Sequence, residues 1–214
     1  MPRNNPDDAA APRAIRSGES ASISAQVYRQ LHSAIVRGKI SPGERLSESE
    51  IARQYATSRQ PVREAFIKLA EARLVSIQPQ RGTFVVKISI ADVMDARFVR
   101  EAIEIAVARE AAAAASPAAI RQMRGIVDAQ RALEPGRNDE FLALDEEFHR
   151  RLALSVGHAH AWRVIENIKA QMDRIRYLSL DDATPIHLLI EQHQRIVDGI
   201  EAGDPTAAAA AMRS

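Results

Sequence analysis

The 214-residue sequence contains no cysteine. A disulfide framework and a thiolate metal site are therefore excluded, and the absence fits a reducing cytoplasm. The sequence also has no run close to the roughly 20 apolar residues that a membrane-spanning helix needs, and residues 1–22 lack the apolar core of a signal peptide. We expect a cytoplasmic protein with no membrane partner.

Net charge is almost absent as well, at +1, but this total conceals a division. Residues 1–88 contain 14 Lys or Arg and 8 Asp or Glu, which gives a net charge of +6. Residues 89–214 contain 15 Lys or Arg and 20 Asp or Glu, which gives a net charge of −5. A basic amino-terminal part attached to an acidic remainder is typical of a polyanion-binding domain on a body that does not bind polyanions. Ordinary scatter of charge is the alternative.

The amino-terminal part divides into a tail and a domain. Residues 1–20 have few large apolar side chains and predict a disordered tail. Within residues 21–88, apolar positions at helical spacing predict a helix over 23–36, and Ser47 with Glu50 forms a capping box for a second helix. A third helix is expected over 58–72, followed by a hairpin of strands 74–77 and 83–86. Three helices and a β wing indicate a winged helix-turn-helix domain.

The rest of the chain, residues 89–214, has an entirely helical pattern without a sequence repeat. The fold class is therefore mostly α, with the winged helix-turn-helix domain joined to an all-α bundle of about six helices. The helices are expected near residues 91–114, 117–133, 138–156, 159–180, 184–202 and 204 onward.

The start of the third helix has the residues of a DNA reader. Arg59 and Arg63 lie one turn apart, and the planar fork of an arginine matches O6 and N7 of guanine in the major groove. Ser58 and Gln60 can add hydrogen bonds at the helix entrance. The alternative is a solvated face on which the arginines pair with glutamates. Other basic residues suit phosphate contacts, which position the protein without specifying a sequence: Arg45, Arg53 and Arg81.

Three polar residues fall within apolar stripes of the helical part. Asp145 and His149 are one turn apart on one helix, and His193 has a similar place on another. A buried carboxylate is costly unless it is paired or binds a metal. These residues can form an open ligand set suited to zinc above all, with nickel, manganese or iron as alternatives. Ordinary core hydrogen bonds are the competing interpretation.

Two arginines have the same inward placement. Arg100 and Arg176 can each grip a carboxylate ligand through a guanidinium fork. An internal ion pair between Arg100 and Glu104 competes with this hypothesis. Arg174, with Asn167, is expected on a solvent or dimer face.

The segments 42–48, 58–65 and 79–85 make the amino-terminal domain resemble the GntR family of bacterial transcription regulators over residues 23–86. The resemblance implies a dimer that reads a palindromic operator through the third helix, with Gly82 of the wing close to the minor groove. Ala56 departs from the family, which usually has Gly in the turn between the second and third helices. A left-handed Ala there would cost roughly 1–2 kcal/mol.

The segments 100–104, 145–149 and 193–213 make the helical part resemble the FCD effector domain of the FadR branch of that family, over about residues 91–214. The resemblance implies a divalent metal on the Asp and His positions and a small organic acid beside it. It also implies a further His after Met212-Arg213, but the sequence ends at Ser214. Either the sequence is truncated or the site is more open and weaker.

Together these features predict a metabolite-responsive transcription regulator, a repressor rather than an enzyme, that acts as a homodimer on double-stranded operator DNA. Two alternatives stay open. The helical domain can be a metal-dependent enzyme attached to a DNA-binding domain, because three ligands with open positions also make a catalytic arrangement. It can also be a dimerisation module without a working pocket.

Overall fold

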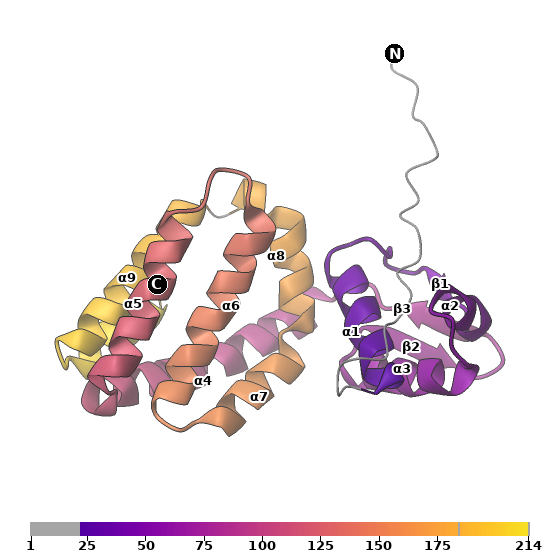
Figure 1. Ribbon diagram of the computed structural model, residues 1–214, viewed down its shortest axis with the longest axis horizontal. Coiled ribbons are helices and arrows are strands. Elements are labelled where there is room, and N and C mark those ends of the chain that lie inside the picture. Colours follow the sequence, from indigo (N-terminus) through magenta and orange to yellow (C-terminus); the bar gives the residue numbers. More distant parts are fainter. Residues whose placement is uncertain (1–21, 184, 214) are drawn as a thin grey trace, which may run out of the picture. The chain divides into compact units, whose positions relative to one another are not determined.

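The structure is a computed structural model that describes residues 22–183 and 185–213. The expected tail, residues 1–20, lies outside this range. The chain divides into two compact units, and the boundary in sequence lies between Lys87 and Ile88. The unit that ends at Lys87 is the head, and the unit that begins at Ile88 is the body (Figure 1).

The head is a winged helix-turn-helix domain, as the sequence predicted. Its small sheet is antiparallel with strand order β1-β3-β2, and Leu46 of β1 pairs with Thr83 of β3. Because β1 has only two residues, it shows no alternation in the sequence, and the sequence analysis missed it. The elements are α1 (Ile23–Val36), β1 (Arg45–Leu46), α2 (Glu48–Gln54), α3 (Arg59–Glu71), β2 (Val75–Gln78) and β3 (Gly82–Val85).

Local signals in the sequence explain where the head helices begin and how they pack. The Ser47 hydroxyl accepts a hydrogen bond from the Glu50 amide at 3.4 Å, so Ser47 is the N-cap of α2, at the position that the capping-box pattern predicts. Between α2 and α3, Ala56 has φ +50°, the left-handed conformation that glycine adopts without strain. The buried faces of α1 and α3 pack together around Val27, Leu31, Val62, Phe66 and Leu69.

The body is entirely helical, as predicted, and has seven helices within the described ranges. The sequence predicts six, because residues 159–180 have one continuous helical pattern. The structure ends one helix at Ile168 and begins the next at Ala170. The helices are α4 (Ile90–Ala114), α5 (Pro117–Arg131), α6 (Asn138–Ser155), α7 (Ala159–Ile168), α8 (Ala170–Ala183), α9 (Ile186–Glu201) and α10 (Pro205–Arg213).

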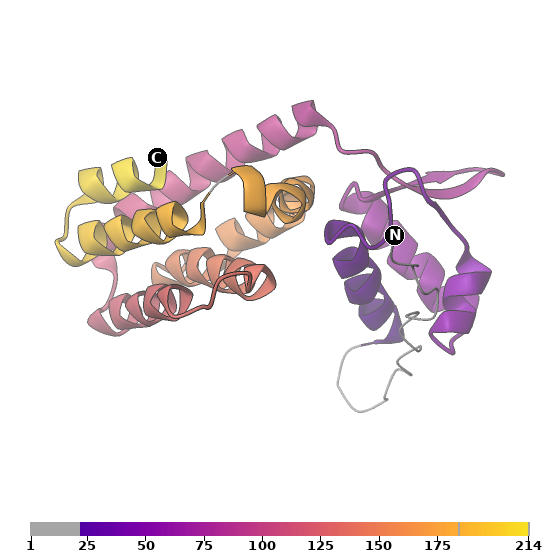
Figure 2. The same cartoon turned by 90° about the horizontal axis from the view of Figure 1, so that it is seen from above.

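A continuous apolar core fixes the helices of the body. The helices α9 and α10 approach closely, since a Cβ on Gly199 would lie 2.7 Å from the backbone nitrogen of Ala208. Figure 2 shows α10 and α9, both yellow, beside the long α4. Among the described residues, no helix is long and apolar enough to cross a membrane. The largest members of the core include Met123, Phe148, Leu152, Ile165 and Ile196.

Candidate functional site

The predicted DNA-contacting residues of α3 lie at its exposed amino-terminal end. Ser58 is the N-cap residue, and its hydroxyl makes no capping hydrogen bond to the helix. Arg59 and Gln60 follow on the surface, and the Gln60 amide donates to Glu64 at 3.2 Å. The helix therefore presents its amino terminus, a hydroxyl and a guanidinium to solvent, which is the arrangement needed to enter a groove.

Arg63 is already paired in the free head. Its Nε and Nη2 each donate to a carboxylate oxygen of Glu48 at 3.0 Å. These hydrogen bonds lower the pKa of Glu48. The alternative of an intramolecular pair therefore holds for Arg63, although its side chain keeps 59 % of its surface exposed. An exposed pair of this kind contributes only about 0–1 kcal/mol, so DNA can replace it.

The wing brings two of the predicted phosphate contacts close to its glycine. Gly82 has φ +116°, and a Cβ there would approach Nε of Arg45 to 2.9 Å. Arg45 pairs with Phe84 across β1 and β3, which places it on the wing sheet. Arg81 lies exposed in the hairpin turn, and Arg53 is exposed in the last turn of α2.

In the body, the structure brings together the three predicted metal ligands. Asp145 and His149 project from α6 and His193 from α9, and one ligand atom from each lies within 4.8 Å of the others. They are only 2 %, 8 % and 1 % exposed. Their gathering depends on the packing of two helices about 45 residues apart in sequence, which the separate helical patterns did not establish.

A glutamine that the sequence analysis did not consider orients His193. Nδ1 of His193 lies 2.9 Å from Oε1 of Gln130 on α5. Because an amide oxygen only accepts, Nδ1 must donate, which leaves the lone pair on Nε2, 3.6 Å from Oδ1 of Asp145. Burial lowers the pKa of His193 to about 3, so the ring stays neutral. The sequence does contain a signal for Gln130. The residue follows Met123 and Val127 at helical spacing, which places it on the same buried face of α5.

The two predicted effector arginines lie beside these ligands, each paired with an acid. Nη1 of Arg176 is 2.8 Å from Oδ2 of Asp145. Burial opposes ionisation of Asp145, but Arg176 and His149 together lower its pKa below the usual range. Arg100 donates to Glu104 at 2.9 Å, as the competing hypothesis proposed, and the same oxygen of Glu104 lies 3.0 Å from Nδ1 of His149. These six residues, Arg100, Glu104, Asp145, His149, Arg176 and His193, form a cluster that is called the chamber below. It contains two arginine–carboxylate ion pairs beside two histidines.

The donor atoms of this chamber fit a divalent metal. Oδ2 of Asp145 and Nδ1 of His149 are buried and make no hydrogen bond of normal geometry, although charged neighbours are close. Carboxylate oxygen and neutral imidazole nitrogen are the ligand types that zinc, nickel, manganese and iron accept. Asp145, His149 and Nε2 of His193 are thus the residues that would hold the ion.

One prediction for α8 was wrong. Arg174 was expected on a solvent or dimer face, but it is only 2 % exposed, and its Nη1 donates to Gln171 at 3.1 Å. The helix break at Lys169 accounts for the error, because the faces of α8 cannot be extrapolated from those of α7. Asn167, before the break, is exposed as expected.

Comparisons with known proteins agree with this architecture. Residues 23–85 match the family described as bacterial regulatory proteins, gntR family, and residues 95–214 match the FCD domain. The chain belongs to the GntR family, in its FCD-containing form. It is accordingly a DNA-binding transcription regulator. It is 44 % identical to the HTH-type transcriptional repressor RspR of Escherichia coli K12 over 191 residues, 89 % of this chain and 84 % of RspR.

Further relatives and solved structures extend the comparison. A probable D-xylose utilization operon transcriptional repressor of Paenarthrobacter nicotinovorans is 31 % identical over 89 % of this GntR-family chain and 84 % of its own. A GntR regulator from Rhodococcus sp. RHA1 superposes with a TM-score of 0.71 at 28 % identity, over 90 % of this chain and 93 % of that one. E. coli McbR/YncC superposes with a TM-score of 0.75 at 20 % identity, over 89 % of this chain and 92 % of McbR/YncC. At this identity the likeness shows the fold alone.

Proposed function

We propose that this GntR-family regulator is a dimeric cytoplasmic repressor that leaves its operator when a small carboxylate binds in the body beside a divalent metal. The observation that supports the proposal is the buried chamber in which Asp145, His149 and His193 lie next to Arg100 and Arg176. A site for a neutral apolar effector would not need two guanidinium groups and a set of metal-binding atoms in one place.

The arginines explain the preference for a carboxylate. Each guanidinium has five N–H donors, more than a contact with one carboxylate oxygen uses. Arg100 and Arg176 can therefore hold Glu104 and Asp145 and still donate to a ligand. A divalent metal, when bound, adds a Lewis-acidic partner for a carboxylate oxygen. Zinc is the first choice because it accepts the mixed nitrogen and oxygen set at low coordination number, with nickel, manganese and iron as alternatives.

The head supplies operator recognition. Arg59 and Arg63 of each protomer, with Ser58 and Gln60, are assigned to base edges and nearby phosphates of a half-site. A dimer of two such heads reads a palindrome whose half-sites are one helical turn apart. The repressor name of the E. coli relative supports the sign of regulation. Backbone phosphates are assigned to Arg45, Arg53 and Arg81, with Gly82 at the minor groove.

A binding difference between two states links the body to the head. If the carboxylate binds one arrangement of the dimer better than the other, it shifts the population toward that arrangement. A change in the spacing of the heads then breaks their register with the half-sites. No direct contact between the effector and DNA is needed.

The test is a thermal-shift screen of small organic acids on metal-free protein, with and without zinc, followed by DNA binding with each hit. A ligand at 100 times its Kd stabilises the folded state by about 2.7 kcal/mol. We expect one acid to raise the melting temperature only with metal and to release the operator. Arg100→Gln should remove this response, whereas Arg97→Gln, on the exposed side of α4, should keep it.

Two outcomes of this screen would contradict the effector proposal. If neither metal nor any acid changes melting or DNA affinity, the body is a dimerisation module and the effector proposal is wrong. If an acid is instead consumed during incubation with the metal-loaded protein, the body is an enzyme.

A further inference from the structure

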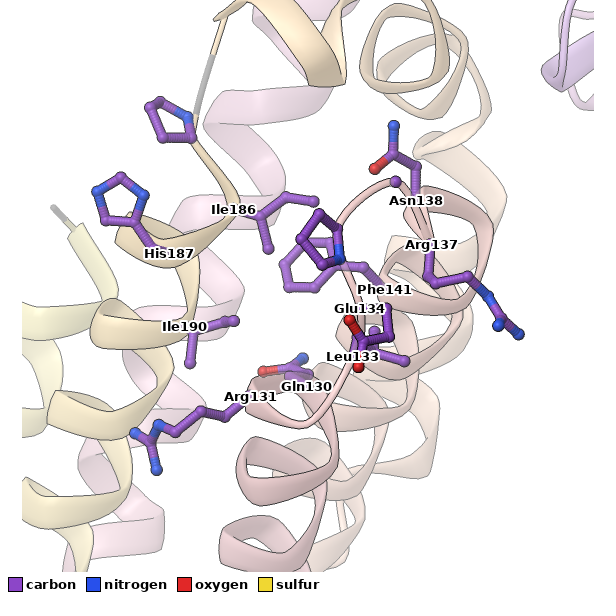
Figure 3. Close-up of a pocket in the computed structure, with 13 residues that line it drawn as sticks. Gln130, Arg131, Leu133, Glu134, Arg137, Asn138, Phe141, Ile186, His187 and Ile190 are labelled. Carbon is purple, nitrogen blue, oxygen red and sulfur yellow. The ribbon is translucent and has the colours of Figure 1, made fainter.

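A cavity lies at the end of the body formed by the α5–α6 connection and the start of α9. Its volume is about 370 Å³, within the range of small-molecule pockets. Its walls are largely apolar and come from three helices and the connection. Figure 3 shows Gln130, Phe141, Ile186 and Ile190 turned toward this space.

The base of the cavity has one unsatisfied polar group. Gln130 is 1 % exposed, and its Oε1 is engaged by His193. Its Nε2 is buried and has no hydrogen-bond partner among the residues that the structure describes. A buried amide donor without an acceptor is costly, so this nitrogen favours an occupant that supplies an oxygen.

Charged residues at the rim contribute less to recognition. Arg131 donates to Gln194 at 3.2 Å, and Arg137 pairs with Glu140. In Figure 3 both arginine side chains extend away from the space that Phe141 faces. The lining also includes Glu134, Asn138 and His187. Within the described lining, Nε2 of Gln130 is the buried donor without a partner, so the apolar wall and this donor are the features on which selection depends.

We propose that this cavity is a second ligand site, separate from the chamber beside the metal, for a small aromatic or branched-chain compound whose carbonyl or carboxylate oxygen accepts from Nε2 of Gln130. The apolar body of the ligand lies against Phe141, Ile186 and Ile190. The site requires neither a metal nor the effector of the proposed function, so either proposal can fail without the other.

Gln130 also connects the cavity to the chamber, because its side chain lines the cavity and is hydrogen-bonded to His193. The same amide group donates to the cavity ligand and accepts from His193, and hydrogen bonds in such a chain polarise one another. Occupation of the cavity should therefore strengthen the bond that orients Nε2 of His193. Binding in the cavity and metal binding at His193 should favour each other, by the same factor in both directions.

The test uses the full chain with isotope-labelled isoleucine methyl groups, freed of metal by a chelator. The probes are benzoate, benzamide and 4-methylvalerate, with toluene as the analogue that has no acceptor oxygen. We expect at least one oxygen-bearing probe to shift the methyl signals of Ile186 and Ile190 saturably. Toluene should bind about tenfold more weakly because the amide of Gln130 stays unpaired.

Matched variants locate the binding. Ile186→Trp fills the cavity and should abolish these shifts, with Ile186→Phe as a milder substitution if the first variant folds poorly. Leu188→Trp, two residues along α9 and 47 % exposed, should leave binding intact. Gln130→Glu keeps an oxygen toward His193 but removes the donor, so it should weaken benzoate binding about tenfold.

Three results would overturn the second site: no probe shifts the methyl signals, Ile186→Trp binds as the parent does, or binding disappears in Arg100→Gln but survives in Ile186→Trp. The last result would place the probe in the chamber and leave the proposed function intact. Zinc titrations with and without the best probe test the coupling, and an unchanged zinc affinity would show that Gln130 does not link the two sites.

Discussion

His193 donates from Nδ1 to Oε1 of Gln130 over 2.9 Å, and this hydrogen bond decides which ring nitrogen faces Asp145. Both side chains are 1 % exposed, so water cannot easily replace either partner. The neutral ring therefore presents Nε2, with its lone pair, to the chamber. A metal-binding histidine commonly needs such a partner behind it, which fixes its tautomer and its orientation.

We expect Gln130→Leu to weaken zinc binding about 10- to 100-fold, the usual effect of losing the partner behind a histidine ligand. A competition titration of the metal-free protein against a chromophoric chelator measures this change. Gln122→Leu, on the exposed side of the same helix, is the control and should bind zinc as the parent does. Equal zinc affinities for the two variants would show that Gln130 does not support zinc binding by His193.

The two classes of predicted DNA contact should respond differently to truncation. Arg59→Ala should lose about 1–3 kcal/mol on a palindromic operator selected from random DNA, and much less on unrelated DNA, because a base contact discriminates. Arg81→Ala should weaken binding to both DNAs and lower the salt slope by about 1. Fluorescence anisotropy over a range of salt concentrations separates these effects. If Arg59→Ala bound the operator as the parent does, α3 would be wrongly assigned as the reading helix.

The pair between Arg63 and Glu48 predicts a gain of affinity. Glu48→Gln removes a carboxylate that competes with phosphate for Arg63, so DNA affinity should rise by up to about fivefold, in keeping with an exposed pair of about 0–1 kcal/mol. Glu50→Gln removes the same charge from the same turn of α2 without touching the pair and should have a smaller effect. Weaker operator binding by Glu48→Gln would instead show that Glu48 holds Arg63 in its DNA-binding position.

The sequence predicted what depends on local periodicity and capping. The helices of the head, its hairpin and the inward faces of α6 and α9 follow from residue spacing, and the metal-ligand candidates followed from those faces. The features that the sequence did not predict depend on contacts between elements that are distant in sequence, or on a break within a helical pattern. Gln130 became important only because α5 lies against α9, and Arg174 was misplaced because a break at Lys169 interrupts an otherwise continuous helical pattern. The strand β1 exists only because Arg45 and Leu46 find partners in β3.

Ala56 offers a stabilising substitution in the head. Its φ of +50° costs an alanine roughly 1–2 kcal/mol. Ala56→Gly should raise the free energy of unfolding by about 1 kcal/mol, after allowance for the greater entropy of glycine in the unfolded chain. Denaturant unfolding of the full chain tests this. Ala70→Gly, in the last turn of α3, should lose up to about 1 kcal/mol, and stabilisation by both substitutions would contradict the conformational explanation.

The contact between α9 and α10 predicts the opposite effect for a glycine. Gly199→Ala would place a Cβ 2.7 Å from the backbone nitrogen of Ala208 and 3.0 Å from its Cα, and backbone atoms cannot move aside as a flexible side chain would. Overpacking costs typically about 1–3 kcal/mol, and alanine regains about 1 kcal/mol through its helix propensity. We therefore expect a net loss of stability, measured by denaturant unfolding.

Gly125 provides the matched control for this last substitution. It lies inside α5, as Gly199 lies inside α9, but a Cβ there would meet nothing within 4 Å. Gly125→Ala should consequently gain about 1 kcal/mol from helix propensity without a packing cost. If both variants were stabilised equally, α10 would have to yield to the added methyl group. The close approach of α9 and α10 would then contribute little to the stability of the body, and α10 would be free to move relative to α9.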